Sequence, residues 1–308
     1  MDKIERLRKG DRVALVATAR KVSRDEMAPA LKLLRSWGLE AVEPENLYCA
    51  ENQMAGSDEN RADMLQRVLD DDDIRAVFCV RGGYGTVRIV DRIDFSHFAQ
   101  HPKWIVGYSD VTVLHSHIHQ NFGIPTLHAI MPINIPDDAD SRHYPAVDSL
   151  RQMLFEGSFR YENPVSAPCP TFRPGKAEGV VVGGNLSILY SLIGTPSDTD
   201  TDGKILMIED LDEYLYHIDR MMTALGRSGK LARLGGLIVG AMTDMHDNAV
   251  PFGRTAEEIV WDCVKDYDYP VIFNAKFGHI GTENLALPFG CKTAMEVDST
   301  GVLTLSAR

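Results

Sequence analysis

The sequence predicts an α/β protein of two domains. Apolar, strand-like runs alternate with helix-like segments on both sides of a proline-rich window, and 44% of the 308 residues are hydrophobic, enough for a sizeable core. Alternation of this kind is typical of a parallel sheet covered by helices on both faces. We expect an N-terminal domain over residues 1–160, a linker over 161–176 and a C-terminal domain over 177–308.

The N-terminal part contains four short apolar runs that are fit for buried strands. They are Arg12–Ala17, Leu39–Val42, Ala76–Val80 and Trp104–Val106. Between them, Ser23 and Glu26 have the spacing of a capping box, and apolar residues then recur at helical spacing. Ser57 opens a second helix whose first turn is acidic, which suits the helix dipole. The sequence thus predicts repeated strand–helix units.

A window with four prolines and few long apolar side chains, Glu162–Lys176, interrupts this pattern. Strands resume over Gly179–Val182, Lys204–Ile208, Gly236–Val239 and Val271–Phe273. Helices are expected over Leu186–Ile193, Ile218–Leu225 and Thr255–Val264. The C-terminal end, Ala294–Val297 followed by Val302–Leu305, is typical of a hairpin.

Composition excludes several classes of function. The net charge of -12 argues against nucleic acid or an anionic membrane as a partner. No apolar run reaches the roughly 18 residues of a membrane span, and the charged N-terminus does not resemble a signal peptide. The five cysteines are scattered and form no disulfide or metal-binding pattern, so we expect a cytoplasmic protein with no cofactor, in which Cys79 is an inert core residue.

Ser109 is the first candidate for chemistry. It follows the strand Trp104–Val106 through Gly107 and Tyr108, and a helix begins near Val111. A serine on a tight strand-to-helix turn exposes its hydroxyl, and the N–H groups of the helix then face any oxyanion that forms. The alternative is that Ser109 only caps the helix, as serine often does.

A glycine-rich loop, Arg81-Gly82-Gly83-Tyr84-Gly85, directly follows the strand Ala76–Val80. It lies at the carboxyl edge of the expected sheet, where ligands bind. The loop lacks a complete phosphate-binding motif, so it is either a source of oxyanion-hole N–H groups or a tight turn that needs positive φ angles.

Two further residues are placed near strand ends. Glu209 and Asp210 follow a buried strand, and a carboxylate there is either solvated or orients a histidine. His279 follows the strand Val271–Phe273 and has glycines on either side, which makes it the best general-base candidate among the ten histidines. Ser109, Glu209 and His279 together suggest a nucleophile, an orienting carboxylate and a base.

Three other histidines, His115, His117 and His119, alternate on the helix after Ser109. Two of them share a helix face, which is compatible with a metal pair. No acidic residue accompanies them at ligand spacing, and the helix should be partly buried, so we expect no metal site there.

The chain resembles the LD-carboxypeptidase family of serine peptidases, which includes the microcin C immunity peptidases. The motifs that carry the resemblance run nearly end to end. They are Gly10-Asp11, Ala55 to Ala62, Arg81 to Gly85, Gly107 to Asp110, Gly183 to Leu186, Ile208 to Asp210, Gly278-His279 and Leu287 to Gly290. One departure is Ala17-Thr18-Ala19, where many members carry a serine- and proline-containing turn.

The resemblance implies a flavodoxin-like N-terminal domain, a swivelling β/α C-terminal domain and often a dimer. It maps the family's catalytic residues to Ser109, Glu209 and His279. It also implies an oxyanion hole made by the N–H of Asp110 and that of Gly83 or Tyr84. As substrate-binding candidates we take Arg81, Gly82 and Tyr108, although Arg81 is equally suited to a structural ion pair.

Three functions remain to be distinguished. The first is a cytoplasmic serine peptidase that releases terminal D-alanine from a murein tetrapeptide during peptidoglycan recycling, with a murein-derived peptide as its substrate. The second is a microcin-type peptidase acting on a peptidyl nucleotide, against which the absence of tryptophan between Trp104 and Trp261 counts modestly. The third is a non-catalytic ligand-binding protein that uses the glycine loop as an anion cradle.

Overall fold

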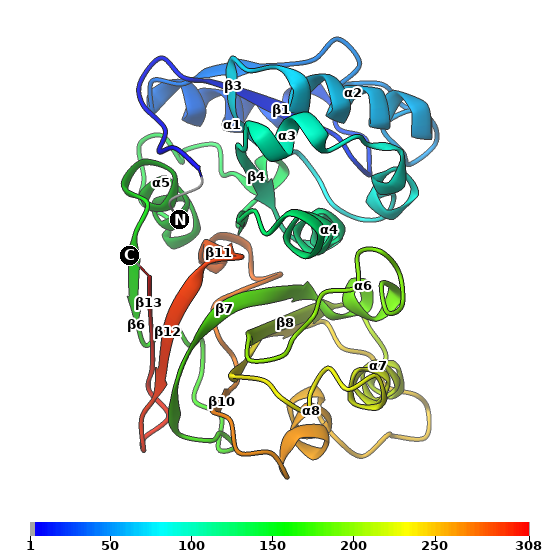
Figure 1. The fold of residues 1–308 in the computed structure, drawn as a ribbon, viewed down its shortest axis with the longest axis vertical. Coiled ribbons are helices and arrows are strands. Elements are labelled where there is room, and N and C mark those ends of the chain that lie inside the picture. The colour runs from blue at the N-terminus through cyan, green and yellow to red at the C-terminus, as the bar shows by residue number, and fades with distance from the viewer. Residues whose placement is uncertain (1–3, 308) are drawn as a thin grey trace.

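The computed structural model describes residues 4–307 and contains two sheets, one above the other (Figure 1). Across the first sheet the strands follow the order β11 (Leu287–Phe289), β5 (Thr126–His128), β4 (Trp104–Gly107), β3 (Ile74–Cys79), β1 (Arg12–Val16) and β2 (Glu40–Val42). The strands β5 to β2 are parallel and β11 is antiparallel to β5. The four expected strands of this half are confirmed, whereas β5 and β11 were not predicted.

Four helices connect the strands of the first sheet, and a fifth leads from β5 to β6. The four are α1 (Arg24–Ser36), α2 (Asp58–Asp70), α3 (Ser96–Gln100) and α4 (Thr112–Phe122), and the fifth is α5 (Pro145–Glu156). The capping box is confirmed, because the Ser23 side chain accepts from the Glu26 N–H and the Glu26 carboxylate accepts from the Ser23 N–H at 2.7 Å. Ser57 caps α2 by accepting from the Asn60 N–H.

The second sheet is mixed. Its strand order is β10 (Val271–Ile272), β9 (Gly236–Thr243), β8 (Ile205–Leu211), β7 (Gly175–Asn185), β12 (Lys292–Val297), β13 (Leu303–Ala307) and β6 (Phe159–Glu162). The strands from β10 to β7 are parallel, and β7, β12, β13 and β6 pair antiparallel. The C-terminal hairpin is therefore confirmed as β12–β13. It was not predicted that β6 would extend the same sheet.

The parallel strands of the second sheet have two buried faces. On β8, Ile205 and Met207 belong to the hydrophobic cluster that also fills the first domain, while Leu206 and Ile208 pack in a separate cluster. That second cluster includes side chains of α6 (Leu186–Ser191), α7 (Leu215–Arg227) and α8 (Ala256–Val264). This alternation has the period of two expected of a strand, and it explains why these strands have continuous apolar runs.

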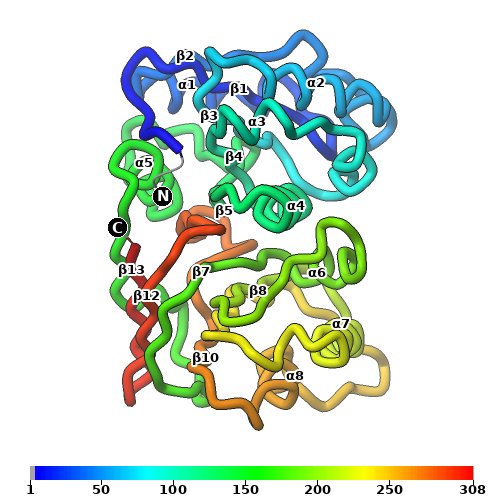
Figure 2. Tube along the Cα trace, viewed as in Figure 1, coloured from blue at the N-terminus to red at the C-terminus, as the bar shows by residue number. Residues whose placement is uncertain are grey.

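The two layers meet along α4, which lies between them next to β7 and α6 (Figures 1 and 2). The Asn185 N–H at the end of β7 donates to Thr112 Oγ1 at 3.0 Å. Gly184, with φ of 127°, allows this approach, since a Cβ there would lie 2.4 Å from the same oxygen. The carboxyl end of β7 is thus fixed against the first turn of the helix that follows Ser109.

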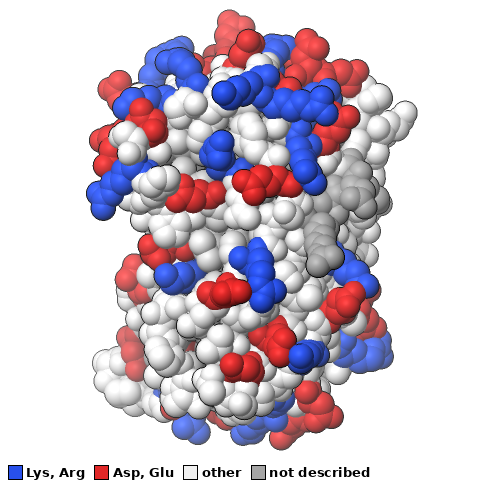
Figure 3. All heavy atoms as spheres, turned by 90° about the vertical axis from the view of Figure 1, so that its left-hand side faces the viewer, with Lys and Arg blue, Asp and Glu red and all other residues white. Residues whose placement is uncertain are grey.

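The surface agrees with an ordinary globular protein. On the face shown in Figure 3, acidic and basic side chains are interspersed. Within residues 4–307 there is no helix of the length and apolarity that crossing a membrane requires.

Candidate active site

Ser109 lies two residues after the end of β4, in the 3₁₀ turn Ser109–Val111, and has φ of 63°. Few non-glycine residues adopt this left-handed conformation, and such strain is concentrated at functional sites. The residue at the N-cap of α4 is Val111, and within residues 4–307 the Ser109 hydroxyl makes no hydrogen bond. The capping interpretation of Ser109 is therefore wrong, and the hydroxyl is left available.

The glycine loop passes beside this hydroxyl. It follows β3, the neighbour of β4 in the parallel sheet. A Cβ added to Gly82 would lie 3.0 Å from Ser109 Oγ, so the loop backbone approaches the serine closely. Gly83 has φ of 107°, and in residues 4–307 the N–H groups of Gly83 and Tyr84 have no hydrogen-bond partner. Two unpaired donors in a strained turn next to a hydroxyl are what an oxyanion requires.

A buried arginine holds the loop in place. Arg61 of α2 is 1% exposed, and its Nη1 donates to the carbonyl oxygens of Thr18 at 2.7 Å and Gly85 at 2.9 Å. Its Nη2 pairs with Asp58. From the other side, the buried Asp110 carboxylate accepts from the Thr86 N–H at 2.9 Å. The loop is therefore attached to α2 and to the residue after Ser109.

His279 and Glu209 form a buried pair. His279 Nδ1 donates to Glu209 Oε2 at 2.6 Å, and Glu209 is completely buried. Burial lowers the pKa of His279, but the charge and the hydrogen bond of Glu209 together raise it above its usual value. Among residues 4–307 no group donates to the other oxygen, Glu209 Oε1. A buried carboxylate with so few partners is best stabilised by an adjacent imidazolium.

Glycines make room for this pair. Gly278 has φ of 105°, and a Cβ there would lie 2.5 Å from Glu209 Oε2. Its N–H donates to the buried Asn284 side chain at 2.8 Å.

Glu209 lies within β8 and not past its end as expected, because the strand continues to Leu211. A bulge near Gly240 on β9 interrupts the pairing with β8 beside it.

Tyr108 brings the two halves together. Its ring centroid lies 4.8 Å from that of His279, and Tyr108 directly precedes Ser109 in the chain. The phenol is buried and donates to Asn134 Oδ1 at 3.2 Å. Burial and the Glu209 charge raise the Tyr108 pKa, so the phenol remains neutral. The residue that precedes Ser109 in the first domain therefore contacts His279 of the second.

Asp210, next to Glu209, has a structural position. Its carboxylate accepts from Asn185 Nδ2 at 2.8 Å and from the Ser187 N–H at 2.8 Å. Burial, followed by the charge of Glu209, raises its pKa to about 7. Asp210 therefore links β8 to the start of α6 and leaves Glu209 as the carboxylate that faces the histidine.

Arg81 and Arg20 both lie near the glycine loop but have different partners. Arg81 Nη1 donates to the Lys21 carbonyl at 3.4 Å and faces Glu26 Oε1 at 3.5 Å. The Arg20 side chain covers Gly83, since a Cβ there would lie 2.6 Å from Arg20 Cδ. Sequence reasoning did not identify Arg20.

The remaining candidates have structural partners. His115 is buried and its ring nitrogens bond to Thr126 Oγ1 at 2.8 Å and the Gly107 carbonyl at 2.9 Å. His117 Nδ1 lies 2.9 Å from Ser197 Oγ. Cys79 is buried in β3, which raises the pKa of its thiol to about 12.

The sequence and structure comparisons agree on a single family. Residues 13–129 match the LD-carboxypeptidase N-terminal domain and residues 178–295 match the C-terminal domain. The chain is 39% identical to the probable murein peptide carboxypeptidase of Bacillus subtilis, over 96% of this chain and 92% of that protein. It is 29% identical to the murein tetrapeptide carboxypeptidase of Pseudomonas aeruginosa, over 92% of each.

Solved structures share the fold over nearly the whole chain. The muramoyltetrapeptide carboxypeptidase of Oxalobacter formigenes superposes with a TM-score of 0.84 and 25% identity, covering 96% of this chain and 98% of that one. The microcin C7 self immunity protein MccF, in complex with glutamyl sulfamoyl guanosine, has a TM-score of 0.83 at 21% identity and covers 99% and 98%. The latter likeness shows a common two-domain α/β fold.

The fold and the comparisons define a serine-type carboxypeptidase, a hydrolase. The chain belongs to the LD-carboxypeptidase family.

Proposed function

We propose that this protein releases the terminal D-alanine from a murein tetrapeptide in the cytoplasm, by a Ser109–His279–Glu209 mechanism. The observation that carries the proposal is the buried His279–Glu209 hydrogen bond of 2.6 Å. The strained Ser109, whose hydroxyl is free, supports it. The two murein carboxypeptidases among the relatives support the substrate class.

In the first step, Ser109 Oγ attacks the carbonyl carbon of the scissile amide while His279 Nε2 takes the hydroxyl proton. Glu209 accepts from Nδ1–H, which fixes the tautomer and stabilises the imidazolium. The oxyanion lies against the N–H of Asp110 and that of Gly83 or Tyr84. His279 then protonates the leaving amine, and the C–N bond breaks to give an acyl-enzyme and the free D-amino acid.

In the second step, His279 takes a proton from a water molecule, which attacks the ester. Collapse of the second tetrahedral intermediate returns the proton to Ser109 Oγ and releases the shortened peptide. No step requires a metal ion.

Recognition of the terminal carboxylate requires a cation near the glycine loop. The Arg20 side chain covers Gly83, the neighbour of Gly82, and Gly82 approaches Ser109. The Arg20 guanidinium donates to Gln53 Oε1 at 3.3 Å and lies beside the loop. The Arg81 guanidinium, by contrast, is directed to Lys21 and Glu26. We therefore assign the carboxylate to Arg20, with Arg81 as the alternative.

Three synthetic peptides test the function. The first ends in an L-to-D amide, the second is its all-L epimer and the third has an amidated C-terminus. We expect rapid hydrolysis of the first alone, because epimerisation misplaces the side chain or the carboxylate and amidation removes its charge. Similar rates on all three would refute LD-carboxypeptidase specificity, and preferential cleavage of a peptidyl-adenylate analogue would favour the microcin-type alternative.

The two arginines are separated with the same peptides. Arg20→Met should raise KM for the free-acid peptide and change the slow reaction of the amide little, while Arg81→Met should affect both peptides equally. The reverse pattern would assign the carboxylate to Arg81.

A further inference from the structure

Two imidazoles and a carboxylate converge at the edge of the first sheet opposite the candidate active site. Asp72 lies in the turn between α2 and β3, and His97 and His101 lie one helical turn apart in and just after α3. His97 Nε2 is 2.9 Å from Asp72 Oδ1, and His101 Nδ1 is 3.9 Å from the same oxygen. The two imidazole rings stack with centroids 4.7 Å apart.

The three side chains have the chemistry of a metal-binding set. One ligand atom from each lies within 4.8 Å of the others. Zinc bound to nitrogen and oxygen at about 2.0–2.2 Å in a tetrahedron separates its ligand atoms by about 3.3 Å. The distances from Asp72 Oδ1 to His97 Nε2 (2.9 Å) and to His101 Nδ1 (3.9 Å) are slightly below and slightly above that value. We propose that Asp72, His97 and His101 bind one divalent transition-metal ion of the zinc class.

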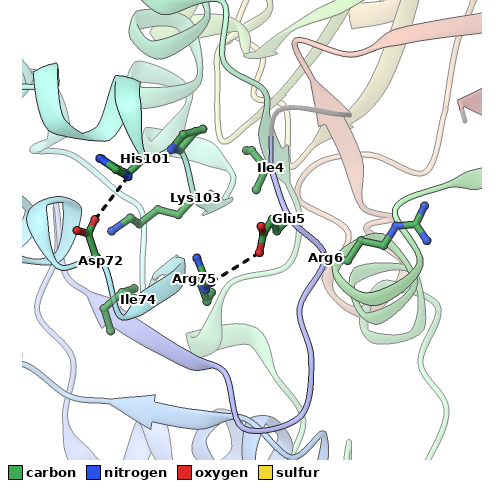
Figure 4. Close-up of a pocket in the computed structure, with 9 residues that line it drawn as sticks. Ile4, Glu5, Arg6, Asp72, Ile74, Arg75, His101 and Lys103 are labelled. Atoms are coloured by element: carbon green, nitrogen blue, oxygen red, sulfur yellow. Dashed lines mark ion pairs between the residues drawn. The ribbon is translucent and has the colours of Figure 1, made fainter.

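Rotation of the imidazole rings out of their stacked arrangement would complete such a site. The side chains of His97, Asp72 and His101 are 37%, 63% and 55% exposed, so rotamer changes meet little resistance. With three protein ligands, the fourth tetrahedral position remains for water. Asp72 and His101 also line a cavity of about 430 Å³ (Figure 4).

Some of the charged residues near Asp72 favour a bound cation and others oppose it. Asp71 and Asp73 flank Asp72 and contribute negative potential, which Arg12 partly offsets through ion pairs of 3.9 and 3.1 Å. Lys103 also lines the cavity and opposes a cation, but its ammonium donates to the carbonyls of Val68 and Asp71. Lys103 is thus held by backbone oxygens, although its charge still acts on Asp72.

The place of the site excludes a role in the peptidase chemistry. Asp72 and His101 precede the amino ends of β3 and β4, whereas the glycine loop and Ser109 follow the carboxyl ends of the same strands. The six residues of β3 separate the two edges by about 20 Å. A bound ion would connect the α2–β3 turn to α3, so it should stabilise the fold and leave turnover unchanged.

Titration calorimetry with ZnCl₂ tests the proposal on the metal-stripped full chain. Wild type should bind one ion, and His97→Ala, His101→Ala and Asp72→Asn should each weaken binding by more than the roughly 10- to 100-fold that loss of an outer-shell partner costs. His143→Ala is the control, since His143 is exposed and faces only Asp148. Zinc should raise the melting temperature of wild type and the control, but not of the three variants.

Two results would overturn the proposal. One is a wild-type protein that takes up no zinc at concentrations up to the millimolar range. The other is a set of three variants that bind zinc as tightly as wild type, which would assign the ion to another pair such as His246 and Asp212. Circular dichroism of each variant establishes that it is folded.

Discussion

Gly278→Ala tests whether the His279–Glu209 geometry controls turnover. The added Cβ would lie 2.5 Å from Glu209 Oε2 and 2.7 Å from Glu209 Cβ and Cγ. Relief to an ordinary contact requires a displacement of nearly 1 Å. The glycine cannot simply retreat, because its N–H is bound to Asn284 Oδ1 at 2.8 Å. A 1 Å misplacement of catalytic groups can cost about 100-fold, and we expect kcat on the L–D peptide to fall by that order.

The matched control is Gly281→Ala in the same loop. Gly281 also has a positive φ, of 58°, but a Cβ there meets no atom within 4 Å. In both variants the positive φ should lower the free energy of unfolding in urea by about 1–3 kcal/mol. Only Gly278→Ala should lose activity and shift the His279 limb of the pH–rate profile. A folded Gly278→Ala enzyme with wild-type kcat and an unchanged profile would refute the argument.

Three further predictions concern the charge of Glu209 and the burial of Arg61. Glu209→Gln should reduce kcat less than Ser109→Ala does. It should also shift the acid limb of the kcat/KM pH profile to lower pH, because Glu209 raises the His279 pKa. An acid limb that does not shift would contradict this reasoning. Because the His279 pKa is raised in the folded chain, protonated His279 contributes its full stability below about pH 6.5, and this contribution is lost as pH rises through the folded-state pKa of His279. Glu209→Gln should therefore reduce the free energy of unfolding more at pH 6 than at pH 9. Arg61→Met should cost about 2–4 kcal/mol in urea unfolding, because it leaves the buried carbonyl oxygens of Thr18 and Gly85 without their donor, while the exposed Arg67→Met on the same helix should cost under about 0.5 kcal/mol.

Local signals made much of the fold predictable. Caps at Ser23 and Ser57 and apolar runs such as Trp104–Val106 depend on neighbouring residues, and the structure confirms them. The return of β11 to the first sheet was not predictable in this way. It pairs residues near Leu287 with residues near Leu127, and three-residue strands give almost no periodicity.

In the candidate site, too, features with a local sequence signal were predictable and those that depend on tertiary contacts were not. Ser109 and His279 stand out because glycines and strand ends adjoin them. Arg61, by contrast, acts through backbone carbonyls of Thr18 and Gly85, which no side-chain pattern shows. Asn284 and the bulge near Gly240 support the Glu209 pair through tertiary contacts alone. Sequence reasoning therefore identified the candidate reacting groups and missed the residues that hold them in place.

The central claim is that Ser109 is the nucleophile of an L–D peptidase. The most direct measurement is kcat of a folded Ser109→Ala variant on the L–D peptide, followed by release of the D-amino acid. The mechanism predicts a fall of about 10⁴- to 10⁶-fold, with a His279→Ala double variant scarcely worse, because the residues act as one unit. A folded Ser109→Ala enzyme within tenfold of wild type would contradict the claim.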